Sequence, residues 1–160
     1  MNKEYLKTLN SVKSYKAISE EEINDKKQLI WLLENYKNSS FDRKLMFGHI
    51  TSSALVLDET HSYVLMAYHN IYDSYAWLGG HADMCFDLEE LARRETEEET
   101  KLDNLKLLLD TPSSIEVLTV DRHIKRGKFI PSHLHYNVTY LYEGNMEASI
   151  QNKPDENSAV

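Results

Sequence analysis

The sequence predicts a protein of the α/β class with additional helices at its N-terminus. Two observations lead to this prediction. Apolar residues recur at helical spacing near the N-terminus and again in an acidic segment in the middle of the chain. Runs of β-branched and aliphatic residues, bounded by polar breaks, lie between and after these segments and have the character of strands.

Length and composition favour a soluble globular protein. The chain has 160 residues, of which 41% are hydrophobic, so it can bury a core without covalent staples. A single cysteine, Cys85, cannot form an internal disulfide, and we therefore expect a cytoplasmic location. No apolar run approaches the roughly 18 residues of a membrane span, so no membrane partner is expected. The net charge of -8 repels polyanions and argues against general nucleic-acid binding.

Two helices are expected before residue 40. Apolar residues from Tyr5 to Val12 recur at helical intervals and predict a short first helix. Ser19 and Glu22 have the spacing of a capping box, and the helix that follows should end near Asn38. We expect residues 1–40 to form a helical extension that packs on a domain spanning 41–160. The tail 151–160 is polar until its last two residues, so truncation of that domain is left open.

The strands are expected after residue 50. Residues 50–57 and 63–68 are rich in β-branched and aliphatic side chains, and the polar break between them indicates a hairpin. Residues 70–77 predict a loop or short strand that leads to Gly79 and Gly80. Residues 114–124 and 136–142 predict further strands, with a basic stretch between them.

An amphipathic helix is expected in the acidic segment. Asp87 and Glu90 have capping-box spacing, so the helix should begin at Leu88. At about 100° per residue, four apolar side chains share the sector that should face the core: Leu88, Leu91, Ala92 and Leu102. Three glutamates fall on the same stripe: Glu95, Glu98 and Glu99.

Glutamates on a buried stripe predict a metal site. An uncompensated buried carboxylate costs several kcal/mol. Carboxylates on successive helical turns suit a hard divalent cation such as Mg²⁺, which prefers oxygen ligands. The Gly79–Gly80 pair would let the backbone approach the same ion closely. The alternative is a solvated acidic helix whose buried face differs from the one assigned.

These residues resemble the signature of the Nudix hydrolases. That signature runs Gly, five residues, Glu, seven residues, Arg-Glu, an aliphatic residue, any residue, Glu-Glu, any residue, Gly and a final aliphatic residue. Six positions fall in register: Gly80, Arg94, Glu95, Glu98, Glu99 and Leu102. The flanking stretches GHITSSALVLDE, WLGGHAD and HLHYN are also similar to one large subgroup of that family.

The resemblance implies a Nudix-type α/β/α sandwich with a mixed β-sheet. It also implies hydrolysis of a small nucleotide-derived substrate, a nucleoside diphosphate linked to another moiety. Carried over by position, Glu95, Glu98 and Glu99 would be ligands of Mg²⁺ or Mn²⁺, with the Gly79 carbonyl as a further ligand. Arg94 would orient the glutamates. The water-activating base would be Glu98 or an acid outside the motif, for which the downstream acids are Glu143, Glu147 and Glu156.

Three positions depart from the signature. Phe86 replaces the first glutamate, Thr96 the aliphatic residue and Lys101 the final glycine. Phe86 would pack against its neighbours instead, and Glu90 could pair with Arg94 one turn later. Lys101 would cost about 1 kcal/mol if a left-handed conformation is required. A second hypothesis therefore stands beside the enzyme: a binding or regulatory module that retains the fold but has lost catalysis.

Several other side chains are candidates for substrate contact. His133 and His135 would lie on one face of an extended segment, near Lys125, Arg126 and Lys128, and could touch phosphate. Gly80 and His81 are assigned to the same substrate-binding set, and the alternative for the histidines is an ordinary surface loop. The aromatic residues Tyr72, Tyr75 and Trp77 either stack on a base or pack in the core. Cys85 is expected to be an unreactive thiol, and a homodimer is left open.

Overall fold

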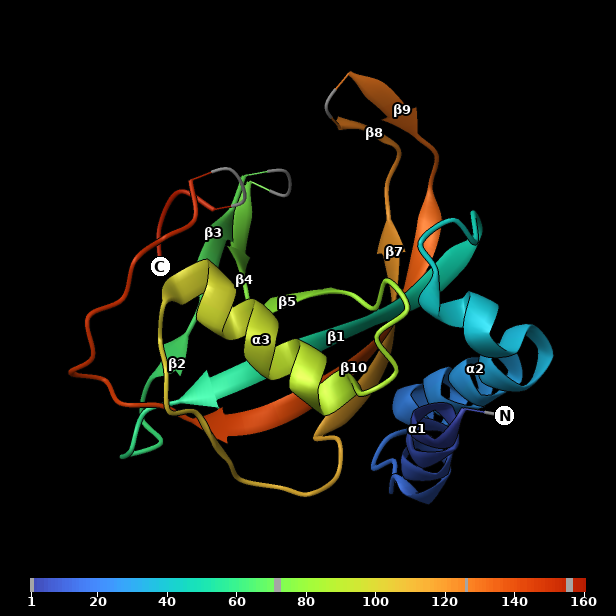
Figure 1. Ribbon diagram of the computed structural model, residues 1–160, viewed down its shortest axis with the longest axis horizontal. Coiled ribbons are helices and arrows are strands. Elements are labelled where there is room, and N and C mark those ends of the chain that lie inside the picture. Colours follow the sequence, from blue (N-terminus) through green and yellow to red (C-terminus); the bar gives the residue numbers. More distant parts are fainter. Residues whose placement is uncertain (1, 71–72, 126, 155–156) are drawn as a thin grey trace. The chain divides into compact units, whose positions relative to one another are not determined.

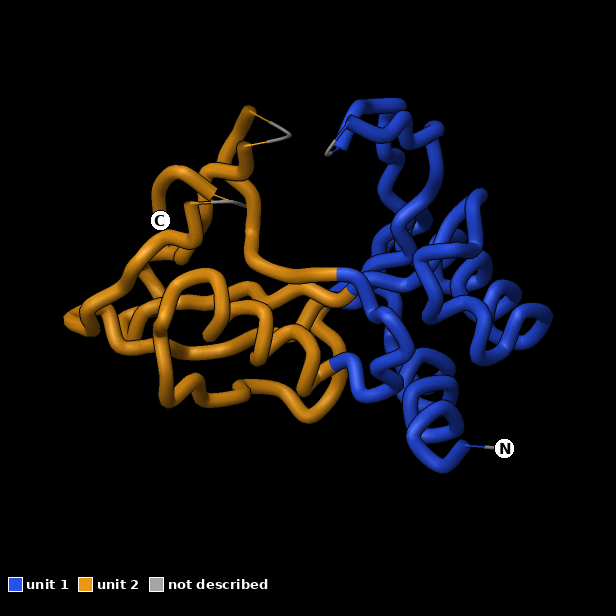
Figure 2. The backbone as a smooth tube through the Cα atoms, turned by 45° about the horizontal axis from the view of Figure 1, so that its top comes forward, with its two compact units in different colours: residues 1–51, 81–88, 114–138 blue, residues 52–80, 89–113, 139–160 orange. Residues whose placement is uncertain are grey.

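The computed structural model describes residues 2–70, 73–125, 127–154 and 157–160. The chain divides into two compact units. Unit 1 contains residues 1–51, 81–88 and 114–138, and unit 2 contains residues 52–80, 89–113 and 139–160 (Figure 2). The division predicted at residue 40 stays a prediction. Among the described residues, no helix combines the length and apolar character that a membrane crossing needs.

The N-terminal helices of unit 1 are α1 (Lys3–Ser14), α2 (Glu20–Tyr36) and the short 3-10 helix η1 (Lys37–Phe41). They confirm the two predicted helices. The Ser19 side chain caps α2 by accepting the Glu22 N–H at 3.1 Å, while the Glu22 carboxylate accepts the Ile18 N–H at 2.8 Å. The Tyr5 hydroxyl donates to the Leu33 carbonyl at 2.8 Å, which ties α1 to α2.

The strands of unit 1 are β7 (Ser114–Val120), β8 (His123–Lys125), β9 (Lys128–Ile130) and the first parts of β1 (Gly48–Leu57) and β10 (His133–Glu143). The Leu134 N–H donates to the Phe47 carbonyl, and Thr51 bonds Asn137 further along both strands. The partner numbers rise together, so β1 and β10 run parallel. The strand predicted over 114–124 is two strands, because the chain leaves β7 after Val120 and turns into the β8–β9 hairpin.

Unit 2 contains the later parts of β1 and β10 with β2 (Val64–Leu65), β6 (Lys106–Leu107) and most of β5 (Leu78–His81). The strand order is β2-β1-β10-β6, with β5 also paired to β1. Strands β2 and β6 are antiparallel to their partners, so the sheet is mixed. The predicted hairpin is confirmed, although its second arm divides into β2 and β3 (Ala67–His69), and β3 pairs with β4 (Ser74–Ala76). The predicted α/β class is thus confirmed.

Helix α3 (Leu88–Thr100) begins at the predicted residue and packs on the sheet of unit 2 (Figure 1). The Tyr142 hydroxyl of β10 donates to the Glu89 carbonyl at 2.9 Å. The predicted apolar stripe is buried. Two threonines extend it, Thr96 and Thr100, whose hydroxyls donate to carbonyls four residues earlier at 2.9 and 2.7 Å.

The helix ends at Thr100, and the next residue, Lys101, has a φ of 60°. Its N–H donates to the Glu97 carbonyl at 2.9 Å, as expected for a left-handed residue that closes a helix. The lysine therefore adopts the conformation that the family signature assigns to glycine.

Candidate metal centre and histidine cluster

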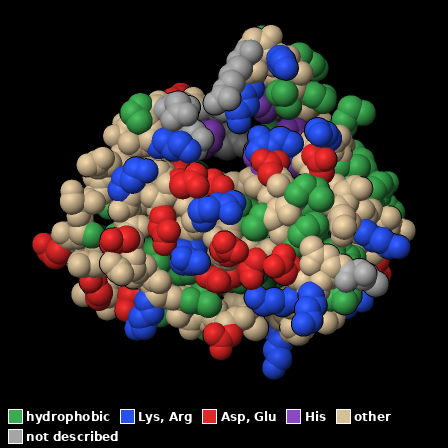
Figure 3. Space-filling view, in the orientation of Figure 1, with side chains coloured by type: hydrophobic (Ala, Val, Ile, Leu, Met, Phe, Trp, Pro, Cys, Tyr) green, Lys and Arg blue, Asp and Glu red, His purple; other side chains and the backbone are tan. Residues whose placement is uncertain are grey.

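The three motif glutamates of unit 2 differ in burial. Glu99 is buried, with 7% of its surface exposed, and the Glu95 side chain is 20% exposed. The Glu98 side chain is 51% exposed, so its predicted place on the buried stripe is wrong. Thr96 and Thr100 belong to the buried sector, and they move its centre away from Glu98. Figure 3 shows acidic and basic side chains gathered where Figure 1 draws α3.

The two glycines of β5 have different neighbours, and only Gly80 lies against one of these carboxylates. A Cβ at Gly80 would lie 2.7 Å from both Cδ and Oε2 of Glu95. A Cβ at Gly79 would lie 2.4 Å from the Ser52 carbonyl oxygen on β1. The absence of a side chain at Gly80 therefore creates the space that the Glu95 carboxylate fills, whereas Gly79 allows β5 to approach β1.

Cations lie beside two of the three carboxylates, those of Glu95 and Glu98. The Arg94 guanidinium is 3.9 Å from Glu95 and 3.8 Å from Glu98. Lys153 lies 4.0 Å from Glu98. Arg93, in contrast, lies near Glu89 and Glu97 on the other side of the helix. Arg94 is therefore close enough to hold both Glu95 and Glu98, as its predicted orienting role requires.

Four histidines of unit 1 gather in one cluster: His49, His81, His133 and His135. The ring centroid of His49 lies 5.1 Å from each of the other three rings. The Nε2 atoms of His133 and His135 are 3.2 Å apart. The predicted pairing of His133 and His135 on one face is seen in β10, and His81 joins them.

His49 is the member that the sequence did not single out. It lies at the start of β1 and is only 5% exposed. A lone histidine at the beginning of a strand carries no spacing signal, so only the fold reveals that it faces three others. The sequence Gly48-His49 alone could not have predicted that His49 joins the cluster.

Three imidazoles of the cluster, those of His49, His81 and His135, are neutral at neutral pH. Burial is the main cause, and it lowers the pKa of His81 to about 2 and that of His135 to about 3. Burial also lowers the pKa of His49. Arg43 adds to these shifts and forms an ion pair with Asp83, with Nε and Oδ1 2.6 Å apart.

Phe86 has the packing role proposed for it. The ring centroids of Phe86 and Phe41 are 4.8 Å apart, and those of Phe41 and Tyr5 are 6.2 Å apart. The Thr8 hydroxyl donates to the Phe86 carbonyl at 2.6 Å. Phe86, at the position of the first signature glutamate, therefore belongs to an aromatic cluster with Phe41 and Tyr5 of the N-terminal helices.

The remaining predicted candidates are more scattered. Tyr75 and Trp77 are 59% and 43% exposed, so core packing is excluded for them, while Tyr72 lies outside the described residues. Glu143 bonds Lys106 and His61 at 3.0 and 3.1 Å, and these bonds, chiefly that from Lys106, lower its pKa. Glu147 is exposed.

The last candidates are Cys85, the downstream acid Glu156 and the basic residues between β7 and β10. Cys85 donates through Sγ to the Asp87 carbonyl at 3.4 Å. Arg126 and Glu156 lie outside the described residues, and Lys125 and Lys128 face each other in the β8–β9 hairpin.

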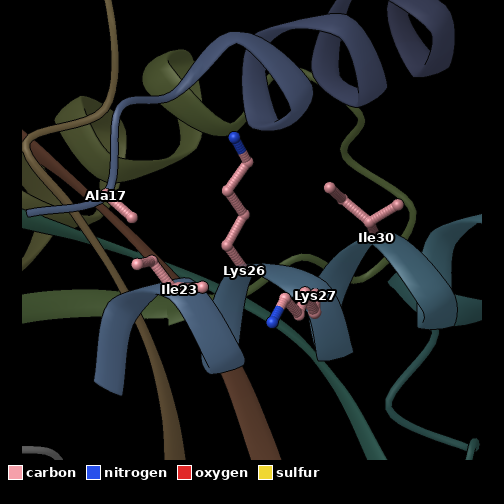
Figure 4. Close-up of a pocket in the computed structure, with 5 residues that line it drawn as sticks. All are labelled: Ala17, Ile23, Lys26, Lys27 and Ile30. Atoms are coloured by element: carbon pink, nitrogen blue, oxygen red, sulfur yellow. The ribbon is translucent and has the colours of Figure 1, made fainter. Parts of the chain in front are cut away.

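A surface hollow of unit 1 lies at the start of α2 (Figure 4). It is lined by Ala17, Ile23, Lys26, Lys27 and Ile30. The Lys26 ammonium donates to the carbonyls of Lys13 and Tyr15 at 2.8 and 2.6 Å, so it holds the α1–α2 connection. None of the predicted site residues lines this hollow.

Comparison with solved structures supports the fold. A Nudix-family hydrolase from Clostridium perfringens superposes with a TM-score of 0.50 and 21% identity, covering 69% of this chain and 77% of that chain. An Ap4A hydrolase from C. elegans, solved as a binary complex, has a TM-score of 0.45 and 18% identity, covering 68% and 74%. No family model and no curated protein matches the sequence. The likeness to the Clostridium protein shows that this chain adopts the fold of a Nudix hydrolase.

Proposed function

We propose that the protein is a divalent-metal-dependent hydrolase that cleaves the pyrophosphate bond of a nucleoside diphosphate linked to another moiety. The observation that carries this proposal is the contact between Glu95 and Gly80. Gly80 has no side chain, so the strand β5 meets the Glu95 carboxylate of the facing helix α3. Both residues are motif positions that a metal site would need. The solved neighbours with the same fold are named as hydrolases, which supports the same reaction class.

The donor set fits Mg²⁺ or Mn²⁺. Glu95, Glu98 and Glu99 would supply carboxylate oxygens and Gly79 a backbone carbonyl, and hard divalent cations prefer oxygen ligands of this kind. The largely buried Glu99 and Glu95 supply negative charge inside the unit, where a cation is most stabilising. When bound, the ion would offset the negative charge of the diphosphate.

Each protein group then has a distinct task. Arg94 would hold Glu95 and Glu98 in place through its two ion pairs. Glu98 would accept the proton of the attacking water, since its carboxylate is half exposed and can reach solvent. Glu143 is a poorer candidate, because a carboxylate whose pKa is lowered by Lys106 is a weaker base. Gly80 would leave the space that the Glu95 carboxylate fills beside β5, and its own contact with substrate stays a prediction.

Calorimetric titration with Mn²⁺ in the presence of a non-hydrolysable diphosphate analogue tests the metal site. We expect one binding event that Glu95→Gln and Glu99→Gln weaken by tenfold or more, on the order of the losses seen when ligand shells are altered. Glu97→Gln is the matched control, because Glu97 lies near Arg93 on the other side of α3. Unchanged binding in Glu99→Gln would contradict the assigned ligands.

Hydrolysis assays test the base. Glu98→Gln should remove turnover of nucleoside diphosphate derivatives while leaving the unfolding temperature within a few degrees of the wild type. Normal turnover by Glu98→Gln would overturn its role.

A second candidate is a nucleotide-binding or regulatory module without catalysis. The packing of Phe86 against Phe41 favours it, because the first signature glutamate has been replaced by a structural residue. This candidate predicts that nucleotides bind but are not hydrolysed by the wild-type protein. The same derivative screen, run with Mn²⁺, separates the two candidates.

A further inference from the structure

We propose that His49, His81 and His135 form a second metal site in unit 1, which binds one transition-metal ion of the zinc class. This proposal does not depend on the proposed hydrolase activity. It concerns a different donor chemistry, since imidazole nitrogens suit zinc, copper and nickel, whereas carboxylates suit magnesium and manganese.

The first argument is geometric. One ring nitrogen from each of the three histidines lies within 4.8 Å of those from the other two. Nitrogens that share a tetrahedral Zn²⁺ lie about 2.0–2.1 Å from the ion and hence about 3.4 Å from one another. Small side-chain rotations would bring the three nitrogens to that separation. Three histidines with a fourth position open also match a known zinc coordination pattern.

The second argument is the state of His49. Its Nδ1 lies 3.4 Å from the Leu45 carbonyl, and a carbonyl can only accept, so Nδ1 carries the proton. Its Nε2 must then present a lone pair, and within the described part of the chain this buried nitrogen has no hydrogen-bond partner. Leaving a buried polar atom unsatisfied costs about 1–3 kcal/mol. A metal ion would satisfy this lone pair, and a backbone carbonyl on the other nitrogen is the usual support of a metal-binding histidine.

The third argument distinguishes a metal from a phosphate. An anion would be held by protonated imidazoles, but burial keeps His49, His81 and His135 neutral, and the neutral form is the one that binds metal. Arg43, a cation that acts on His49, His81 and His135, is already paired with Asp83. The cluster by itself therefore has little attraction for phosphate. The predicted substrate contacts of His81, His133 and His135 stay predictions, and they would gain the missing positive charge from a bound ion.

His133 would act as a positioning residue. Its Nδ1 lies 2.9 Å from the Pro131 carbonyl, which leaves its Nε2 as the acceptor that faces Nε2 of His135 at 3.2 Å. This contact would fix the orientation of the His135 ring. Residues that hydrogen-bond a metal-binding histidine commonly have this role.

Titration of the chelator-treated, full-length protein with Co²⁺ tests the proposal. Tetrahedral Co²⁺ has intense visible absorption bands, whereas octahedral Co²⁺ on carboxylates and water absorbs weakly. We expect one equivalent of Co²⁺ to produce the intense bands, and one equivalent of Zn²⁺ to remove them. A large excess of Mg²⁺ should have no effect.

Variants assign the signal. His49→Gln, His81→Gln and His135→Gln should each lower the Co²⁺ affinity about 100-fold, and far-ultraviolet circular dichroism of each variant reports whether it is folded. His123→Gln is the matched control, because His123 also lies in unit 1 and bonds the Asp121 carbonyl outside the cluster. Glu99→Gln should leave the bands unchanged. The proposal is overturned by weak bands only, by intense bands that survive in folded His81→Gln and His135→Gln, or by bands that Glu99→Gln removes.

Discussion

At the scale of single residues, glycine positions determine where a charged group can lie. Gly79 and Gly80 are neighbours in sequence, yet they meet different partners. Gly79 faces the backbone of β1, and Gly80 faces the flexible end of the Glu95 side chain. Their substitutions should therefore have separable effects on stability and on metal binding.

Gly80→Ala should displace the Glu95 carboxylate and lower Mn²⁺ affinity by about tenfold or more. Its unfolding free energy should stay within about 1 kcal/mol of the wild type, since a side-chain end can move aside. Gly79→Ala should instead destabilise the protein by about 1–3 kcal/mol, because backbone must shift. Denaturant unfolding and Mn²⁺ calorimetry measure the two effects. Equal stability losses in both variants would contradict this division.

Phe86→Glu should not restore an ancestral site. The change removes an aromatic contact with Phe41 and places a carboxylate in a half-buried position, so we expect a loss of about 1–3 kcal/mol in unfolding free energy. Phe86→Leu keeps an apolar side chain and should lose less. Hydrolysis rates, measured together with unfolding free energies, show whether Phe86→Glu gains activity. A gain of turnover would support the non-catalytic alternative for the wild type.

At the scale of the element, α3 shows what a helical wheel can and cannot predict. The capping-box spacing predicted the start at Leu88, and the wheel predicted the apolar stripe and the inward side of Glu95 and Glu99. It failed for Glu98, because only apolar side chains defined the stripe, and the buried Thr96 and Thr100 widen the sector on the side away from Glu98. Threonine hydroxyls that bond to the preceding turn need no outside partner, so such residues can be fully buried.

The end of α3 yields a stability prediction. Lys101 adopts a left-handed conformation that disfavours any residue with a Cβ. Lys101→Gly should therefore stabilise the protein by about 1 kcal/mol, which corresponds to about 2–4 °C in the unfolding midpoint. Asn104→Gly is the matched control, because Asn104 has a φ of 58° but asparagine tolerates this region. A scan of thermal unfolding in which Lys101→Gly melts earlier would refute the argument.

At the scale of the whole molecule, periodic patterns predicted the class and most elements, but not the histidine cluster. The helices before residue 40, the first hairpin and α3 follow from local spacing. His49, His81 and the pair on β10 come from three separate segments, and the pairing of β1 with both β10 and β5 brings them together. Long-range pairing has no local sequence signal, so the sequence could assign His81, His133 and His135 to one substrate-binding set but could not show that His49 lies among them.

The cluster should also make global stability depend on pH. For His81 and His135 the folded pKa lies below the ordinary value of 6.5, so the unfolded chain binds protons more readily. With metal chelated, stability should be full above pH 6.5 and should fall as the pH decreases toward 3. Denaturant midpoints across this range, compared with those of His81→Gln, measure the contribution. His123→Gln should retain the wild-type pH dependence, and an unchanged dependence in His81→Gln would argue against a neutral buried imidazole.

The parallel pairing of β1 and β10 also governs how the protein folds. Thr51 and Asn137, which bond across these strands, are 86 positions apart in the chain. A pair of parallel strands cannot form until the whole intervening segment has closed on itself, and such non-local closure slows folding. During synthesis, the edge of β1 that pairs with β10 therefore stays unpaired until residues 133–143 have left the ribosome. In this interval the nascent chain is most exposed to misassembly.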